Sequence, residues 1–119
     1  MKLLSVVILA SLLTACGLIP DKFDSAEYSA IVRVAVIAEN AKGCDSYDIS
    51  TAWLDAAFLE KYAENTMNEN THKIYEQLFA QVTELKDRED PSVGYCVVKW
   101  KNISKISEEI LSMSGSRMK

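Results

Sequence analysis

The first sixteen residues set the strongest limit on how this chain folds. Lys2 is followed by an apolar stretch, residues 3–13, that only two serines interrupt, and then by the small residues Thr14 and Ala15. A positive start, a short apolar segment and small residues before a cleavage site are typical of a secretory signal peptide. A membrane-spanning helix needs about 20 apolar residues. We therefore expect residues 1–15 to be removed on export and to take no part in the fold.

The end of this segment resembles the lipobox of bacterial lipoproteins, in which Leu, a small residue, Ala and Cys follow one another. Here those positions are Leu13, Thr14, Ala15 and Cys16. The resemblance implies cleavage by signal peptidase II before Cys16 and attachment of a diacylglycerol to its sulfur. One acyl chain holds a protein only marginally, whereas two or more anchor it stably. The alternatives are an ordinary signal peptide with an incidental cysteine and a buried N-terminal helix.

Gly17 bears on where such a lipoprotein is sorted. In Gram-negative bacteria an Asp at this position usually retains a lipoprotein at the inner membrane, and here the residue is Gly. For such a host, the resemblance implies a location in the cell envelope, on the inner leaflet of the outer membrane and facing the periplasm. We interpret residues 16–22 as the lipidated cysteine and a short tether. The six residues after Cys16 reach at most about 20 Å, which keeps the folded part close to the membrane.

The remaining chain has the length of a single domain. Hydrophobic residues make up 49% and charged residues 25% of the sequence, which is ordinary for a globular protein. We predict a helical domain at residues 23–114 and a frayed tail at residues 115–119. Residues 21–90 carry fifteen acidic against seven basic residues, and residues 91–119 carry two against five. This acidic body argues against a nucleic-acid partner, which requires a basic face.

Two cysteines, Cys44 and Cys96, remain once Cys16 carries lipid. An even number of thiols in an oxidising compartment predicts a disulfide. Closing a loop of this length is expected to stabilise the domain by about 4 kcal/mol. A redox or metal-binding pair is the weaker alternative, because there is no C-x-x-C motif and the single His72 lacks ligand spacing.

Apolar residues recur at helical spacing in four segments. The first begins with a capping box of Asp24 and Glu27 and stops before Gly43, although residues 31–37 are β-branched enough for a strand. The second is expected at residues 51–67, and the third from Asn70 or Thr71 to about residue 89. The fourth follows residues 90–91, with a short strand at residues 95–98 as the alternative. The fold class expected is all-α: a small four-helix domain with one disulfide.

Several side chains have both a structural and a functional interpretation. Trp53, Phe58 and Tyr62 form either an aromatic binding stripe or, as we favour at this spacing, part of the core. His72 is interpreted as a solvated residue. A basic stretch with one aromatic residue is a possible contact for a membrane or a partner, because each lysine near anionic headgroups adds about 1 kcal/mol. We favour the alternative, a solvated helix face, for this stretch, which contains Lys99, Trp100, Lys101 and Lys105.

No catalytic motif accompanies these features. The chain has neither G-x-S-x-G nor H-E-x-x-H, and a triad has only His72 to draw on. We therefore expect that the protein is not an enzyme and that it binds neither a cofactor nor a metal. A small anchored domain acts mainly by occupying a surface, which favours a non-enzymatic binding or inhibitory protein of the envelope with a protein partner. The alternative is a small structural accessory subunit of an outer-membrane or secretion complex.

The cysteine frame adds a weaker resemblance. Cys44 and the pair Tyr95 and Cys96 resemble the layout of spackle-type periplasmic phage proteins, which are small, acidic and helical with one long-span disulfide. This resemblance covers the cysteine frame alone, and the lipid anchor departs from that family. It implies inhibition of a lysozyme, since an acidic body suits a basic enzyme. The chain is also similar to the entry-exclusion lipoproteins of conjugative plasmids, which are short and anchored as well. That similarity implies superinfection or entry exclusion.

Overall fold

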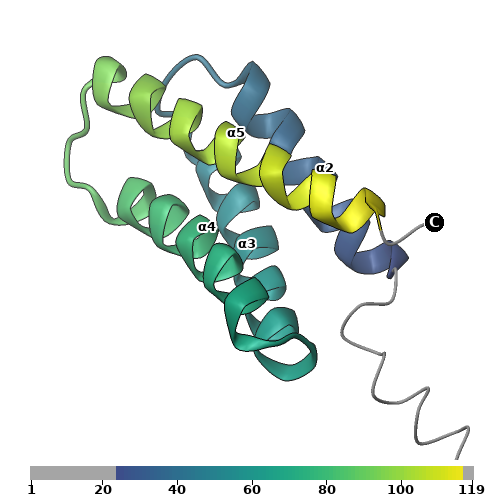
Figure 1. Cartoon of the computed structure of the whole chain (residues 1–119). Helices are drawn as coiled ribbons and strands as arrows, with labels where there is room; N and C mark the ends of the chain where they lie inside the picture. Colours follow the sequence, from purple (N-terminus) through teal and green to yellow (C-terminus); the bar gives the residue numbers. More distant parts are fainter. Residues whose placement is uncertain (1–23, 117–119) are drawn as a thin grey trace, which may run out of the picture.

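The computed structural model describes residues 24–116, and in this range the chain forms four α-helices and no strand. Their bounds are α2 (Ser25–Asn40), α3 (Ser46–Thr66), α4 (Glu69–Asp87) and α5 (Val93–Ser116). The prediction of an all-α, four-helix domain with one disulfide is confirmed (Figure 1). Residues 31–37 and 95–98 are helical, so both strand alternatives are wrong.

A short polar side chain precedes each helix and accepts a hydrogen bond from a backbone N–H in its first turn, which is how helix starts are stabilised. The acceptors are Asp24, Asp45, Asn68 and Ser92, at 2.9–3.0 Å. Only the first of these caps is the one predicted. The second helix begins five residues before the predicted position, and this earlier start brings Ile49 into the core. Each interhelical segment holds several residues able to cap, and burial of apolar residues selects among them.

Each helix packs against two neighbours, so the four form a closed ring in chain order: α2 with α3, α3 with α4, α4 with α5, and α5 with α2. Consecutive helices run in opposite directions and are joined by short connections (Figure 1). The bundle therefore has two ends. The disulfide pole comprises residues 40–46 and 87–93, and the tether pole comprises the start of α2, residues 66–69 and the end of α5.

The core combines a few large side chains with several alanines. Ile31, Leu59, Leu78, Trp100 and Ile103 are almost fully buried. Small residues dominate the inner face of α3, where Ala52, Ala56 and Ala63 have no exposed surface. Because alanine projects little beyond the backbone, these positions let the neighbouring helices approach α3 closely.

Candidate functional site

The residues assigned to lipidation and sorting lie outside the described part of the chain. These are Leu13, Thr14, Ala15, Cys16 and Gly17. Their roles therefore remain predictions. Among residues 24–116, no helix combines the length and the apolar character needed to cross a membrane.

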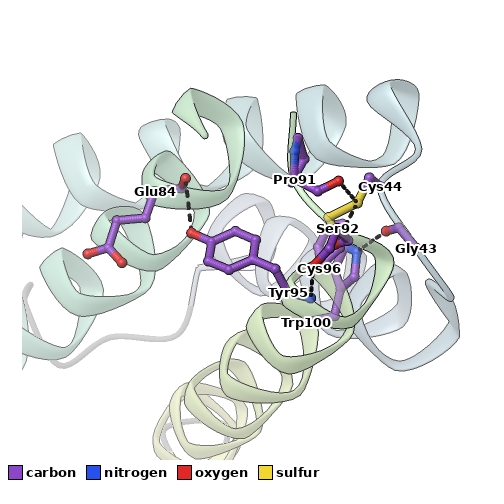
Figure 2. Close-up of a disulfide and its surroundings, with 8 residues drawn as sticks. All are labelled: Gly43, Cys44, Glu84, Pro91, Ser92, Tyr95, Cys96 and Trp100. Atoms are coloured by element: carbon purple, nitrogen blue, oxygen red, sulfur yellow. Dashed lines mark hydrogen bonds between the residues drawn. A yellow bond between two sulfur atoms is a disulfide. The ribbon is translucent and has the colours of Figure 1, made fainter. Parts of the chain in front are cut away.

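Cys44 and Cys96 are joined, with their Cα atoms 5.5 Å apart (Figure 2). The bond links the connection after α2 to the first turn of α5. The indole N–H of Trp100 donates to the Gly43 carbonyl at 2.8 Å, next to this bond. Tyr95 points the other way, towards α4, and its hydroxyl donates to the Glu84 carbonyl at 3.5 Å (Figure 2). Three contacts from one end of α5 thus fasten the disulfide pole.

The residues of the basic stretch of α5 have different surroundings in the structure. Trp100 is only 1% exposed, so both interpretations are wrong for this residue, the favoured solvated face as well as the membrane or partner contact. Its spacing from Cys96 and Ile103 puts it on the core face of the helix. Lys99 turns towards α4, where its ammonium group contacts Gln81 and Glu84. Lys101 and Lys105 remain exposed and border a groove between α2 and α5.

The aromatic residues of α3 also differ from one another in burial. Trp53 is partly buried against the core, and its indole N–H donates to the Thr83 hydroxyl at 3.1 Å. Phe58 is 43% exposed and stacks on Tyr62 with ring centroids 6.0 Å apart. The core interpretation therefore holds in part for Trp53 and Tyr62, which are partly buried, and is wrong for Phe58, because alanines take most of the inner face of α3.

His72 is not the solvated residue that was predicted. Its side chain is 18% exposed, and its Nε2 lies 2.9 Å from Oε2 of Glu60, whose side chain is 19% exposed. Glu76 stands one turn later on α4. One ligand-type atom from each of Glu60, His72 and Glu76 lies within 4.8 Å of the others. The sequence shows the four-residue spacing of His72 and Glu76, but only the packing of α3 against α4 brings in Glu60.

An open groove of about 550 Å³ runs beside this cluster, between α3 and α4. Two of its lining residues, Glu60 and Glu76, belong to the cluster. Phe79, Ala80, Thr83 and Glu84 form the rest of the lining. The lining of the α3/α4 groove therefore mixes the apolar side chains of Phe79 and Ala80 with three carboxylates and one hydroxyl.

Four large apolar side chains are exposed at the disulfide pole or within the next few residues of the helices that start there. Tyr47 is 76% exposed, three residues after Cys44. Val93, Val97 and Val98 are exposed in the first turns of α5, around Cys96. The exposure of these residues was not predictable from the sequence, because helical spacing alone does not show that the valines beside Cys96 face outwards.

Two exposed ion pairs perturb the ionisation of basic side chains. Asp55 raises the pKa of Arg33, first through its hydrogen bonds and then through its charge. Glu64 raises the pKa of Lys61 in the same way. Both basic groups are solvated, so these pairs describe surface electrostatics rather than a reactive centre.

Comparisons with protein-family models, with curated protein sequences and with solved structures gave no match to this chain.

Proposed function

We propose that this chain is an envelope lipoprotein, anchored through Cys16, whose helical domain binds a protein partner without catalysing a reaction. The disulfide supports an oxidising compartment, since such bonds persist mainly there. The distance along the chain supports a close attachment. Helix α2 begins at Ser25, and the nine residues from Cys16 span at most about 30 Å. In this arrangement the tether pole faces the membrane and the disulfide pole faces away.

The exposed apolar side chains at the disulfide pole carry this proposal. Tyr47, Val93, Val97 and Val98 are in the part of the domain farthest from the tether. Apolar residues rimmed by charged ones are typical of protein interaction surfaces. The segments 39–48 and 86–93 around them contain six acidic and three basic residues. A partner with a basic surface suits this charge.

Within this class, inhibition of a lysozyme or exclusion of a superinfecting phage or plasmid suits an acidic domain presented from a membrane. A basic lysozyme matches the charge of the disulfide pole. A small accessory subunit of an outer-membrane or secretion complex is the alternative function. The size of the complex recovered with the protein separates these possibilities.

Metabolic labelling with palmitate tests the anchor. We expect the wild-type chain to be labelled and to fractionate with membranes, and the Cys16→Ser variant to be unlabelled. Equal labelling of both chains would remove the anchor from the proposal.

Crosslinking in intact envelopes followed by affinity capture tests the binding surface. We expect the double variant Val93→Ser, Val98→Ser to lose the crosslinked partner. Leu54→Ser is the matched control, because Leu54 is equally exposed but lies on α3 away from the disulfide pole. Loss of the partner from the control and not from the double variant would contradict the proposed surface. Recovery of a large assembly instead of one basic protein would favour the accessory-subunit alternative.

A further inference from the structure

The cluster of Glu60, His72 and Glu76 lies near the tether pole, away from the surface proposed for the partner. We propose that these three residues bind a divalent transition-metal ion, with zinc as the reference ion. This inference depends on neither the lipid anchor nor the partner, because it uses only side chains of α3 and α4.

The ligand set fits this class of ion. Zinc is commonly held by imidazole nitrogen and carboxylate oxygen, and three protein ligands leave a position for water or another ligand. An imidazole selects transition metals over magnesium or calcium, which prefer oxygen ligands alone. Two carboxylates also balance the two positive charges of the ion. The chemistry of His72 therefore decides the class of metal, and the two glutamates supply the charge.

The backbone already brings the three ligand side chains close together. His72 and Glu76 are four residues apart on α4, so they share one face of the helix. Glu60 reaches them from α3, and its carboxylate already lies 2.9 Å from His72. Zinc–ligand distances of about 2.0–2.2 Å require ligand atoms roughly 3–3.5 Å apart. The remaining adjustment falls on Glu76, whose exposed side chain is free to change rotamer.

Partial burial makes the cluster more than a group of surface acids. The side chains of Glu60 and His72 are each less than one-fifth exposed and already held in contact. Because folding has ordered them, an ion meets a partly formed site.

Glu60 and Glu76 also line the α3/α4 groove, so a bound ion borders that groove. A carboxylate entering the groove is a suitable fourth ligand. The ion ties α3 to α4 near the tether pole, while the disulfide fastens the opposite pole.

Zinc titration of the full chain, purified in detergent without reductant, tests this inference. We expect one zinc ion per chain by calorimetry and a rise of several degrees in the thermal midpoint, because a ligand that binds the folded state stabilises it. Cobalt(II) serves as a spectroscopic probe, because a four-coordinate cobalt site absorbs visible light much more strongly than the hydrated ion. Magnesium and calcium are expected to produce neither effect.

Three variants decide whether these residues are the ligands. His72→Ala and Glu76→Gln are expected to weaken zinc binding by at least about 100-fold, since losing an outer partner of a metal ligand already costs 10–100-fold. Glu109→Gln, an exposed charge loss on α5, is the control and is expected to bind as wild type does. Glu76→Gln alters an exposed side chain, so it tests the site even if His72→Ala is unstable. Failure of the wild type to bind zinc, or equal binding by Glu76→Gln, would overturn the inference.

Discussion

Tyr75 donates its hydroxyl to the carboxylate of Glu27 across the centre of the bundle, and neither side chain has any exposed surface. Glu27 is in the first turn of α2 and Tyr75 is on α4, two helices that lie diagonally opposite and do not pack directly on each other. A buried carboxylate is costly unless it is hydrogen-bonded. This hydrogen bond therefore helps to hold α2 and α4 in one relative position across the bundle.

Removing the Tyr75 hydroxyl tests this relationship. We expect Tyr75→Phe to lower the free energy of unfolding by about 1–3 kcal/mol, because a buried carboxylate loses a donor while the ring volume is kept. Urea denaturation measures the change. Tyr47→Phe is the matched control, since Tyr47 is largely exposed, and it is expected to leave the stability nearly unchanged. Equal effects of the two substitutions would mean that the buried hydroxyl of Tyr75 contributes no more to stability than an exposed one.

Reducing the disulfide is expected to destabilise the domain strongly. The bond joins residues separated by 52 positions, and the loop-entropy model gives about 4 kcal/mol for a loop of that size. In a domain of this size such a loss lowers the thermal midpoint by at least about 15 °C. Thermal unfolding followed by circular dichroism, with and without dithiothreitol, measures the difference. The Cys44→Ser, Cys96→Ser variant is expected to show the low midpoint under both conditions. A midpoint indifferent to reductant in the wild type would contradict this expectation.

Trp100 is expected to remain shielded from lipid. In a Trp53→Phe background it is the one tryptophan left, and its indole is buried beside the disulfide. We expect a blue-shifted emission that brominated anionic lipids in proteoliposomes do not quench. The reciprocal Trp100→Phe variant reports on the partly exposed Trp53 and serves as the comparison. Strong quenching of Trp100 would restore the membrane contact that the structure argues against.

The contact between Arg33 and Asp55 is expected to contribute little, and equally at all ordinary pH values. The raised pKa of Arg33 means that its contribution is fully present below the unfolded pKa and is lost only as pH rises through the folded pKa, which lies far above the ordinary range. Arg33 is exposed, so Arg33→Gln is expected to cost less than about 1 kcal/mol. Urea denaturation at pH 6 and pH 9 is expected to give the same difference from wild type. A difference that changes between these pH values would show that another titrating group acts on the pair.

The positions of the helices could be predicted from the sequence more fully than the choice of which face of each helix is buried. The capping aspartate of α2 was predictable because a capping motif is local in the sequence. The disulfide was predictable because only two cysteines remain once Cys16 carries lipid. On α4, Ile74 is only partly buried, and the neighbouring Tyr75 is fully buried, since Glu27 on α2 offers its hydroxyl a partner. Similarly, Glu27 was expected to act only in the capping box of α2. Its side chain instead lies in the centre of the bundle.

By itself, the sequence determined that this chain forms four helices closed by a bond between Cys44 and Cys96. Helical periodicity depends on spacing along the chain, and two remaining thiols allow only one pairing. The tertiary structure alone decided that Trp100 is buried and that Glu60 meets His72. It also decided which apolar side chains of α3 and α5 face outwards. The physical reason is that each helix carries more apolar residues than one face can bury, so the choice of buried face depends on the neighbouring helices. Contacts between helices distant in the chain leave no periodic signal in the sequence.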